Sequence, residues 1–546
     1  MNRQLSFMDF ILLATPILLQ EVTQGWEVGS IGGLLAMPQF NEYFNYPSPF
    51  RQGSMTAALI AGELGGSMFT GFLTADRFGR KKTIYFGGVV YIVGQALVIA
   101  AQNQAMFIVG RVVNGLGAGA LITTIPLYTA EIAPVHVRGR LGGNLNSGTA
   151  LGLFLTYWVQ YGTAKLSGTA AWRLPLALQL LPVLVILPLM VFRPESPRWL
   201  VTKDRNEEAL EALAKLRGHN DINDSEVAAE LAEIQVIVDY DKRLKPPSLF
   251  ALVFGRQDRR RTYLGVGLLF LHELAGVNIC LYYAPKVFSQ AGVSDTQASL
   301  LANAINGALL LVTTSVLVWF ADDLGRRTQM IFGPLCMGTC FIVVGALLKS
   351  YGNPHCDNVT QAVTFTFHDK AASRAAIAFM YLYMCSFGLL YACVGQTYPQ
   401  EIFSLRARGR GTALAFASNW LVNFWLGLYI PTALNQASWR IYLKQREGHC
   451  KSDTFTKTPL ASQLTFMIRE EIDTLFTPER TVWVFMDKKA RSKEQLLHGD
   501  LSDGTKVADQ LRDMLKKGSS KALDDAEAAD SSGAKEISVT HDEHAT

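Results

Sequence analysis

The chain carries one charged turn twice, as Ala75-Asp76-Arg77-Phe78-Gly79-Arg80-Lys81 and as Ala321-Asp322-Asp323-Leu324-Gly325-Arg326-Arg327. Each copy stands between two apolar runs. A second repeated pattern places a carboxylate ahead of an Arg-Gly-Arg turn, with Glu131 before Arg138-Gly139-Arg140 and Glu401 before Arg408-Gly409-Arg410. Charged turns that recur at matching helix boundaries indicate a duplicated bundle of membrane-spanning helices, which is the common plan of secondary transporters.

The composition fits helices that pack against one another in lipid. Apolar residues make up 49% of the chain and charged residues only 18%, and 46 glycines allow helices to approach closely. The seven cysteines are scattered, so we expect neither a disulfide framework nor a zinc site. Gly115-Leu116-Gly117-Ala118-Gly119 lies inside an apolar run, where it predicts a helix-packing face rather than a phosphate-binding loop. We find no enzyme motif and expect no cofactor, metal or nucleic-acid partner.

Apolar runs of about 20 residues, the length that crosses the hydrocarbon core, predict eleven spans. The first span is the least regular, because Gln20, Glu21, Gln24 and Glu27 interrupt it. The expected spans lie near residues 8–36, 54–75, 83–101, 106–128, 141–162, 174–192, 262–284, 299–321, 329–348, 375–397 and 409–432.

The expected fold is all-α, a polytopic bundle of two pseudo-repeated six-helix halves in which the twelfth helix is missing or degraded. Residues 444–469 contain no apolar run near 20 residues, and no Pro-Glu-Thr turn precedes Glu470. Either a coding segment was lost from this sequence, or the protein has eleven spans and its C-terminus lies outside. We expect four parts: an N-terminal bundle at 1–192, a cytosolic loop with short amphipathic helices at 193–261, a C-terminal bundle at 262–443, and an irregular segment with a disordered tail at 444–546.

The basic residues predict the orientation. Even-numbered loops are rich in Lys and Arg and odd-numbered loops are poor in them, so the positive-inside rule places the even loops, the long middle segment and the N-terminus in the cytosol. The glycosylation sequon at Asn358 then falls outside.

Five motifs occur in the order seen in one known group of transporters. They are Gly71-x4-Asp76-Arg77-x-Gly79-Arg80-Lys81, Gly110-Arg111, Arg193-Pro194-Glu195-Ser196-Pro197-Arg198-Trp199-Leu200, Gly276-x-Asn278-x3-Tyr282-Tyr283-Ala284-Pro285 and Asn419-Trp420-x2-Asn423-Phe424. Between about residues 20 and 440 the chain therefore resembles the sugar-porter branch of the major facilitator superfamily, in its fungal form. The resemblance implies a multi-pass protein of the plasma membrane that moves its solute by alternating access.

The resemblance also implies that the repeated charged turns form a latch between the two halves. The residues that match it are Asp76, Arg77, Arg80, Glu131, Arg138, Glu195, Arg198, Asp322, Arg326, Glu401 and Arg408. The same charges also serve as helix caps and topology determinants. Asp323 occupies the place of Arg77 in the second copy, which alters that half of the latch.

Two ionisable residues inside spans point to proton coupling, since such residues are costly in lipid and mark functional sites. Glu27 follows Gly25-Trp26 in the first span, where proton-coupled relatives carry an Asp, and Arg111 lies in the fourth span, where an Arg pairs with that Asp. A structural ion pair between the two spans is the alternative.

A hydroxyl-rich solute needs several fixed donors and acceptors together with aromatic surfaces. The candidate residues are Asn146, His272, Glu273, Asn278, Tyr282, Tyr283, Asn306, Gln396, Asn419 and Trp420. Asn423 fits better as a link between helices. His272-Glu273 replaces the Gln pair that the family usually carries, and Gln396 replaces its Trp. These departures bring pentoses, polyols and disaccharides into consideration beside hexoses.

The sequence therefore predicts a carrier that binds a sugar or polyol and protons and is embedded in membrane lipid, with proton symport favoured over facilitated uniport. A non-transporting nutrient sensor of the same fold is the alternative from another class. Such sensors tend to have much longer cytosolic tails than this chain, and this chain keeps the Glu27/Arg111 pair.

Overall fold

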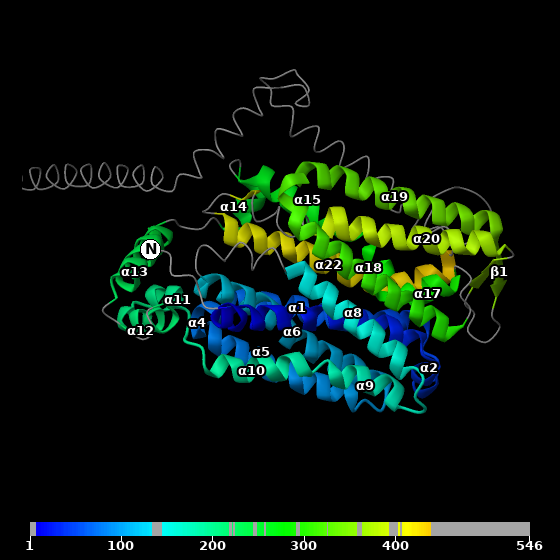
Figure 1. Cartoon of the computed structure of the whole chain (residues 1–546), viewed down its shortest axis with the longest axis horizontal. Coiled ribbons are helices and arrows are strands. Elements are labelled where there is room, and N and C mark those ends of the chain that lie inside the picture. Colours follow the sequence, from blue (N-terminus) through cyan, green and yellow to red (C-terminus); the bar gives the residue numbers. More distant parts are fainter. Residues whose placement is uncertain are drawn as a thin grey trace, which may run out of the picture. The chain divides into compact units, whose positions relative to one another are not determined.

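A computed structural model describes most of the chain up to residue 437 (Figure 1). The described residues are 7–133, 145–217, 221, 224–243, 248–255, 258–290, 295–324, 326–356, 363–367, 369–392, 402–403 and 407–437. The predicted irregular segment 444–469, the tail to residue 546 and the sequon at Asn358 lie outside them.

The N-terminal half, α1 to α10, contains the first six predicted spans as helices. Its elements are α1 (Phe7–Ala36), α2 (Pro38–Tyr43), α3 (Pro49–Phe69), the π-helical turn η1 (Thr70–Thr74), α4 (Ala75–Phe78), α5 (Arg80–Ile99), α6 (Gln104–Ile132), α8 (Leu145–Thr163), α9 (Ala170–Leu178) and α10 (Leu181–Val191). The predicted spans correspond to α1, α3 with η1, α5, α6, α8, and α9 with α10.

Short helices follow α10, as the amphipathic pattern of this segment predicts. They are α11 (Pro197–Thr202), α12 (Asn206–Arg217), α13 (Ser225–Arg243) and α14 (Leu249–Phe254). The apolar faces of α11, α12 and α13 pack on one another through a small buried cluster that includes Trp199, Ala212 and Val238. This cluster buries the apolar stripes that give these otherwise polar helices their periodicity.

The C-terminal half, α15 to α22, contains the remaining predicted spans and one feature that the sequence analysis missed. Its elements are α15 (Arg259–Leu274), α16 (Val277–Tyr282), α17 (Ala284–Gln290), α18 (Thr296–Leu324), α19 (Arg326–Tyr351), β1 (Gly352–Cys356), β2 (Val363–Phe367), α20 (Lys370–Ser386), the π-helical turn η2 (Phe387–Tyr391) and α22 (Arg408–Ala437). Strands β1 and β2 form an antiparallel hairpin between α19 and α20. The alternating Val-Thr-Phe-Thr-Phe of β2 favours a strand, in an otherwise helical set of described residues.

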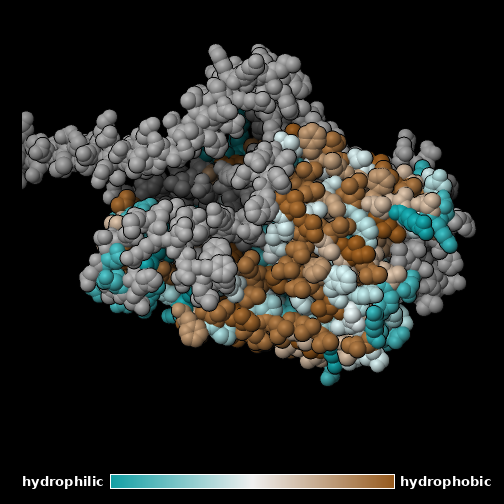
Figure 2. Space-filling model, viewed as in Figure 1, coloured by the Kyte–Doolittle hydropathy of each residue, from teal (hydrophilic) through white to brown (hydrophobic). Residues whose placement is uncertain are grey.

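Eight of the described helical segments are long and apolar enough to cross a membrane. The three other predicted spans, α1, α3 and α8, are also helical, but each buries polar side chains: Glu27, Glu63 and Gln160 are at most 1% exposed. The outward faces of the bundle carry apolar residues such as Phe86, Val89 and Leu184, and Figure 2 shows mainly hydrophobic surface over the helices. A bundle with polar groups inside and apolar groups outside suits a lipid surrounding.

Glycines on α6 bring its neighbours close, as the sequence predicts. A Cβ on Gly115 would meet the carbonyl of Leu59, and one on Gly119 would meet the carbonyl of Glu63, so the backbones of α3 and α6 touch. A Cβ on Gly117 would meet the backbone of Tyr91 on α5. The glycine-rich segment is therefore a packing face that holds α3 and α5 against α6.

Candidate functional site

A break in the seventh span positions its polar residues. Helix α15 ends at Leu274, Gly276 adopts the left-handed conformation with φ of +91°, and α16 starts at Val277. An added Cβ at Gly276 would also collide with the ring of Phe341. Only glycine fits this conformation without strain, so the Gly276-x-Asn278 motif creates a discontinuous helix of the type that forms binding sites in transporters.

Glu273 and three asparagines form a buried network at this break. Asn278 Nδ2 donates to the carboxylate of Glu273 and also, at 3.2 Å, to Asn423 Oδ1. Asn419 Nδ2 donates to Glu273 Oε1 at 2.8 Å. The structure thus brings together Glu273, Asn278 and Asn419 from three separate helices, and Asn423 links α22 to α16 as expected.

His272 lies beside this network, and its ring packs against the rings of Phe387 and Tyr391. Its imidazole stacks on Tyr391 of η2, with ring centroids 4.8 Å apart and an interplanar angle of 21°. Its Nδ1 lies 4.0 Å from Glu273 Oε1. The π-helical turn places Tyr391 here, since such a turn re-aims side chains within a helix.

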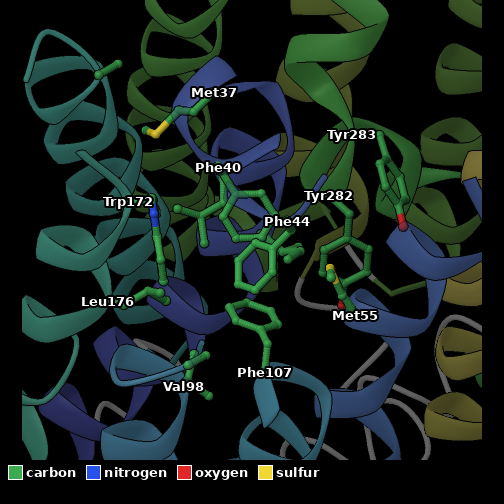
Figure 3. Close-up of a cluster of buried hydrophobic side chains, with 14 of the residues drawn as sticks. Met37, Phe40, Phe44, Met55, Val98, Phe107, Trp172, Leu176, Tyr282 and Tyr283 are labelled. Atoms are coloured by element: carbon green, nitrogen blue, oxygen red, sulfur yellow. The ribbon is translucent and has the colours of Figure 1, made fainter. Parts of the chain in front are cut away.

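Tyr282 and Tyr283 pack into an aromatic cluster near α2, at the end of the bundle assigned to the outside (Figure 3). The Tyr282 hydroxyl donates to Asn423 Oδ1 at 3.2 Å. The Tyr283 hydroxyl donates to the carbonyl of Gly427 at 2.8 Å and lies 3.0 Å from Thr56 Oγ1 on α3. Trp420 packs against the same cluster. These contacts join the two halves at the end of the bundle that the sequence predicts to lie outside.

Two of the other predicted substrate residues, Asn306 and Asn146, lie on α18 and α8. Asn306 on α18 is buried, and its Oδ1 has no hydrogen-bond partner within the described part of the chain. Asn146 Nδ2 donates to the carbonyl of Ala392 at 3.3 Å and joins α8 to the end of η2. Gln396 lies outside the described residues.

The predicted Glu27 and Arg111 pair lies in the interior of the N-terminal half. Both side chains are at most 1% exposed, on α1 and α6. Arg111 Nη1 donates to Ser30 Oγ at 3.3 Å, and Ser30 Oγ donates to the carbonyl of Glu27 at 2.9 Å. A third titratable group, Glu63 of α3, adjoins both of them and is equally buried. The site therefore contains two carboxyl groups and one guanidinium.

The first copy of the predicted latch is an assembled cluster. Arg80 Nε and Nη2 donate to the two carboxylate oxygens of Glu131, each at 2.9 Å, and Nη1 donates to Asp76 Oδ1 at 3.1 Å. Glu195 Oε1 accepts from the backbone N–H groups of Arg80 at 3.1 Å and Lys81 at 3.2 Å, so its carboxylate caps the N-terminus of α5. Gly79, with φ of +98°, lets the chain turn there.

The remaining predicted latch residues are placed differently. Arg77 is exposed, with its guanidinium 5.6 Å from the centre of the Phe78 ring, and Arg198 is exposed on α11. In the second copy, Asp322 lies near the end of α18, Arg326 begins α19 and Arg408 begins α22. Arg138 and Glu401 lie outside the described residues. The turns thus fall at the predicted helix boundaries in both copies.

Comparisons with known proteins agree with this architecture. The family model described as sugar (and other) transporter matches residues 13–445. The chain belongs to that family. Membership in the sugar (and other) transporter family makes it a multi-pass membrane protein of the major facilitator type.

Individual relatives cover most of the chain. A glucose transporter of the major facilitator superfamily from Aspergillus flavus is 31% identical over 494 residues, 87% of this chain and 92% of that protein. A high-affinity glucose transporter from Kluyveromyces lactis is 31% identical over 423 residues, 77% of this chain and 76% of that protein. The xylose transporter XylE from E. coli, in a partially occluded inward-open conformation, superposes with a TM-score of 0.64 at 21% identity. That match covers 88% of this chain and 100% of XylE and shows a shared fold.

Sequence reasoning missed two buried polar residues of this sugar (and other) transporter family member. Glu63 is the carboxyl beside Glu27 and Arg111, and Gln160 on α8 donates through Nε2 to the carbonyl of Ser30 at 2.5 Å while its Oε1 has no partner among the described residues. Both stand as isolated polar residues in apolar runs, which is the signal that could have revealed them.

Proposed function

We propose that the chain carries a sugar or similar polyhydroxy solute across the plasma membrane by alternating access and couples this movement to protons. The family supports a sugar, and the relatives described above are named as glucose transporters. The observation that carries the proposal is a pair of buried polar sites. In the N-terminal half, the carboxyl of Glu27 lies with the guanidinium of Arg111. In the C-terminal half, the carboxylate of Glu273 accepts hydrogen bonds from two asparagine amides.

The solute site of this proposal is the network around Glu273. Its carboxylate oxygens accept hydrogen bonds from Asn278 and Asn419, and a sugar hydroxyl can donate to the same oxygens. The amide oxygens and nitrogens supply further acceptors and donors, and the rings of Tyr391 and Trp420 supply apolar faces nearby. A site that offers a carboxylate favours neutral, hydroxyl-rich solutes over anions, because a buried negative charge repels another.

The proton site of this proposal is the carboxyl of Glu27 beside Arg111. When the carboxyl of Glu27 is ionised it pairs with the guanidinium, and when it binds a proton this attraction is lost and Glu27 no longer holds Arg111. Arg111 also lies near Tyr282, whose hydroxyl bonds to Asn423 of the solute network. Proton binding in one half can therefore change the contacts that the other half makes at the outer end.

The test is uptake of a labelled panel in yeast that lacks its own sugar transporters, with hexoses, pentoses, polyols and disaccharides compared at several external pH values. Accumulation against a gradient that grows as the medium is acidified would support symport. Uptake that equilibrates without accumulation would support a uniporter instead. No uptake of any compound, with the protein present in the membrane, would favour the nutrient sensor.

Glu27→Gln is the variant that tests coupling. The substituted side chain is permanently neutral and mimics the protonated state, so accumulation driven by a pH gradient should be abolished while counterflow exchange of preloaded solute continues. Both are measured with the labelled compound that the wild type accumulates most. Accumulation that persists in Glu27→Gln would contradict the proton role of this residue.

A further inference from the structure

The coupling site contains one more carboxyl group than the pair predicted from the sequence. Glu27, Glu63 and Arg111 come from α1, α3 and α6, and each is at most 1% exposed. The tight packing of α3 on α6, where glycine backbones touch, sets the backbone of Glu63 against Gly115 and Gly119 of α6, the helix that also carries Arg111. With both carboxyls ionised the group would carry a net charge of −1 inside the bundle, which is strongly unfavourable without a second cation.

Within the described part of the chain, the titratable residues around Glu27, Glu63 and Arg111 include no second cation. The titratable groups that face the two carboxyls and the guanidinium are Tyr91 of α5, Tyr282 at the end of α16, and Tyr283, which follows α16 directly. These are tyrosines, which are neutral at physiological pH. Tyr91 also accepts a hydrogen bond from Gln179 Nε2 at 3.1 Å, which leaves its own proton available for donation.

The hydrogen bonds of the two carboxyl groups also indicate that one proton is missing from the fully ionised group. The two carboxyl groups lie beside each other and beside Arg111. Yet Glu27 Oε1, Glu27 Oε2 and Glu63 Oε1 have no donor of normal geometry among the described residues. An ionised carboxylate only accepts, whereas a protonated carboxyl has one O–H to donate. A single proton placed between the two groups would supply the missing donor and cancel the excess charge.

We propose that Glu63 and Glu27 together bind one proton as a shared pair, and that this proton and Arg111 make the group neutral. This inference rests on the proton symport proposed above and names a second residue of the same site. Either carboxyl can hold the proton while the other pairs with Arg111, so the proton can pass from α1 to α3 without leaving the interior. Loss of the proton leaves an unbalanced carboxylate, which drives the group to open towards water.

Infrared spectroscopy of the purified full-length protein tests the pair without using any solute. A protonated, buried carboxyl has a C=O stretch that is separate from ionised carboxylates and shifts in D2O. At mildly acidic pH the wild type is expected to show this band. Both Glu63→Gln and Glu27→Gln are expected to lose it, because the remaining carboxylate is then balanced by Arg111. Glu21→Gln, which removes another buried carboxyl of α1, is the matched control. Glu63→Gln and Glu27→Gln should remove one and the same band from the wild-type spectrum, and Glu21→Gln should leave that band in place.

The other outcomes overturn the proposal. A band that survives in Glu63→Gln but not in Glu27→Gln would assign the proton to Glu27 alone. The reverse would make Glu63 a permanently neutral structural group, and survival in both variants, or loss in Glu21→Gln, would place the protonated carboxyl elsewhere. Glu63→Asp keeps a carboxyl and should keep the band, so loss of the band in Glu63→Gln through misfolding is recognised by gel filtration and by this second variant.

Uptake measurements on the Glu63 variants then distinguish a failure of this inference from a failure of the proposed symport. Glu63→Gln is expected to lose pH-driven accumulation at neutral pH, as Glu27→Gln does, whereas Glu63→Asp retains it. If the wild type accumulates no compound of the panel, symport fails while the infrared result still decides whether the pair shares a proton. If the wild type accumulates solute and Glu63→Gln accumulates it equally, the shared pair is wrong and symport remains.

Discussion

Glu273 is bonded to two amides from different segments, and this arrangement explains why a carboxylate can stand where the family usually has a neutral amide. Asn278 lies just beyond the break at Gly276, and Asn419 lies on α22, so the two donors approach the carboxylate from separate directions. A carboxylate accepts hydrogen bonds but does not donate them. In the proposed solute site, a bound solute is therefore expected to offer hydroxyl donors to Glu273.

Removing single amides tests which side chains contact the solute. Asn278→Ala and Asn306→Ala are each expected to weaken apparent affinity by about 1–3 kcal/mol, the usual cost of losing a buried hydrogen bond. The measurement is the half-saturating concentration for uptake, corrected for the amount of protein in the membrane. Unchanged affinity with a lowered protein level would show that these amides serve only to pack helices together.

The His272-Glu273 pair is expected to set the substrate range. Replacing it with Gln-Gln restores groups that both donate and accept, so uptake should broaden towards common hexoses. The labelled panel provides the measurement, with wild type and variant compared at equal expression. An identical uptake profile in the two proteins would make the pair irrelevant to selectivity.

At the level of whole elements, helix ends and helix interruptions position the polar side chains of the candidate sites. Gly276 divides the seventh span, η2 places Tyr391 against His272, and the turn at Gly79 presents the N-terminus of α5 to Glu195. Each is a place where backbone groups leave the regular helical ladder, so side chains there can be aimed inward. The repeated charged turns lie at two such helix ends, between α4 and α5 and between α18 and α19.

The bidentate pair of Arg80 and Glu131 should contribute strongly to stability, because both side chains are less than 10% exposed. Arg80→Gln leaves Glu131 buried without its partner and is expected to cost about 3–5 kcal/mol. Thermal unfolding of the purified protein measures this cost as a lowered Tm. The double variant Arg80→Gln/Glu131→Gln should recover part of the loss.

Arg77→Gln is the matched control in the same motif. Its side chain is exposed, so its removal should change the Tm little. An equal loss of Tm in Arg77→Gln and Arg80→Gln would contradict the importance of the buried pair and would favour a general effect of basic charge at this end of the bundle.

At the scale of the whole molecule, helices of the two halves meet in pairs. Helix α3 packs on α22, α8 packs on α18, and α1 contacts α16 and α17. A Cβ on Gly53 of α3 would meet the backbone of Leu428 on α22, so this contact is close. The Tyr283 hydroxyl also contacts Thr56 of α3, which joins the two halves at the end of the bundle that the sequence predicts to face outside.

A twelfth span would complete the C-terminal half. If a coding segment was lost, sequencing of the transcript should recover about 20 apolar residues between Leu443 and Glu470 and a Pro-Glu-Thr-like turn after them. The physical reason is that helices at the edge of the bundle, where Leu421 and Trp425 are exposed, would gain a neighbour. A transcript that matches the present sequence, with a tail open to protease from outside intact cells, would establish the eleven-span form.

The sequence by itself determined the class of fold, the helix boundaries with their repeated turns, and the family. These properties depend on local signals, namely apolar length, Gly at helix breaks and charge at helix ends, which short stretches of chain contain. The partners across helices were decided only by the tertiary structure. In the sequence, Glu63 is an isolated carboxyl in an apolar run. It joins the Glu27 and Arg111 group only because α1 and α3 both pack against α6. Likewise, sequence spacing cannot reveal that Asn278 and Asn419 reach the same carboxylate, since the fold alone brings residues so distant in the chain within a hydrogen bond of it.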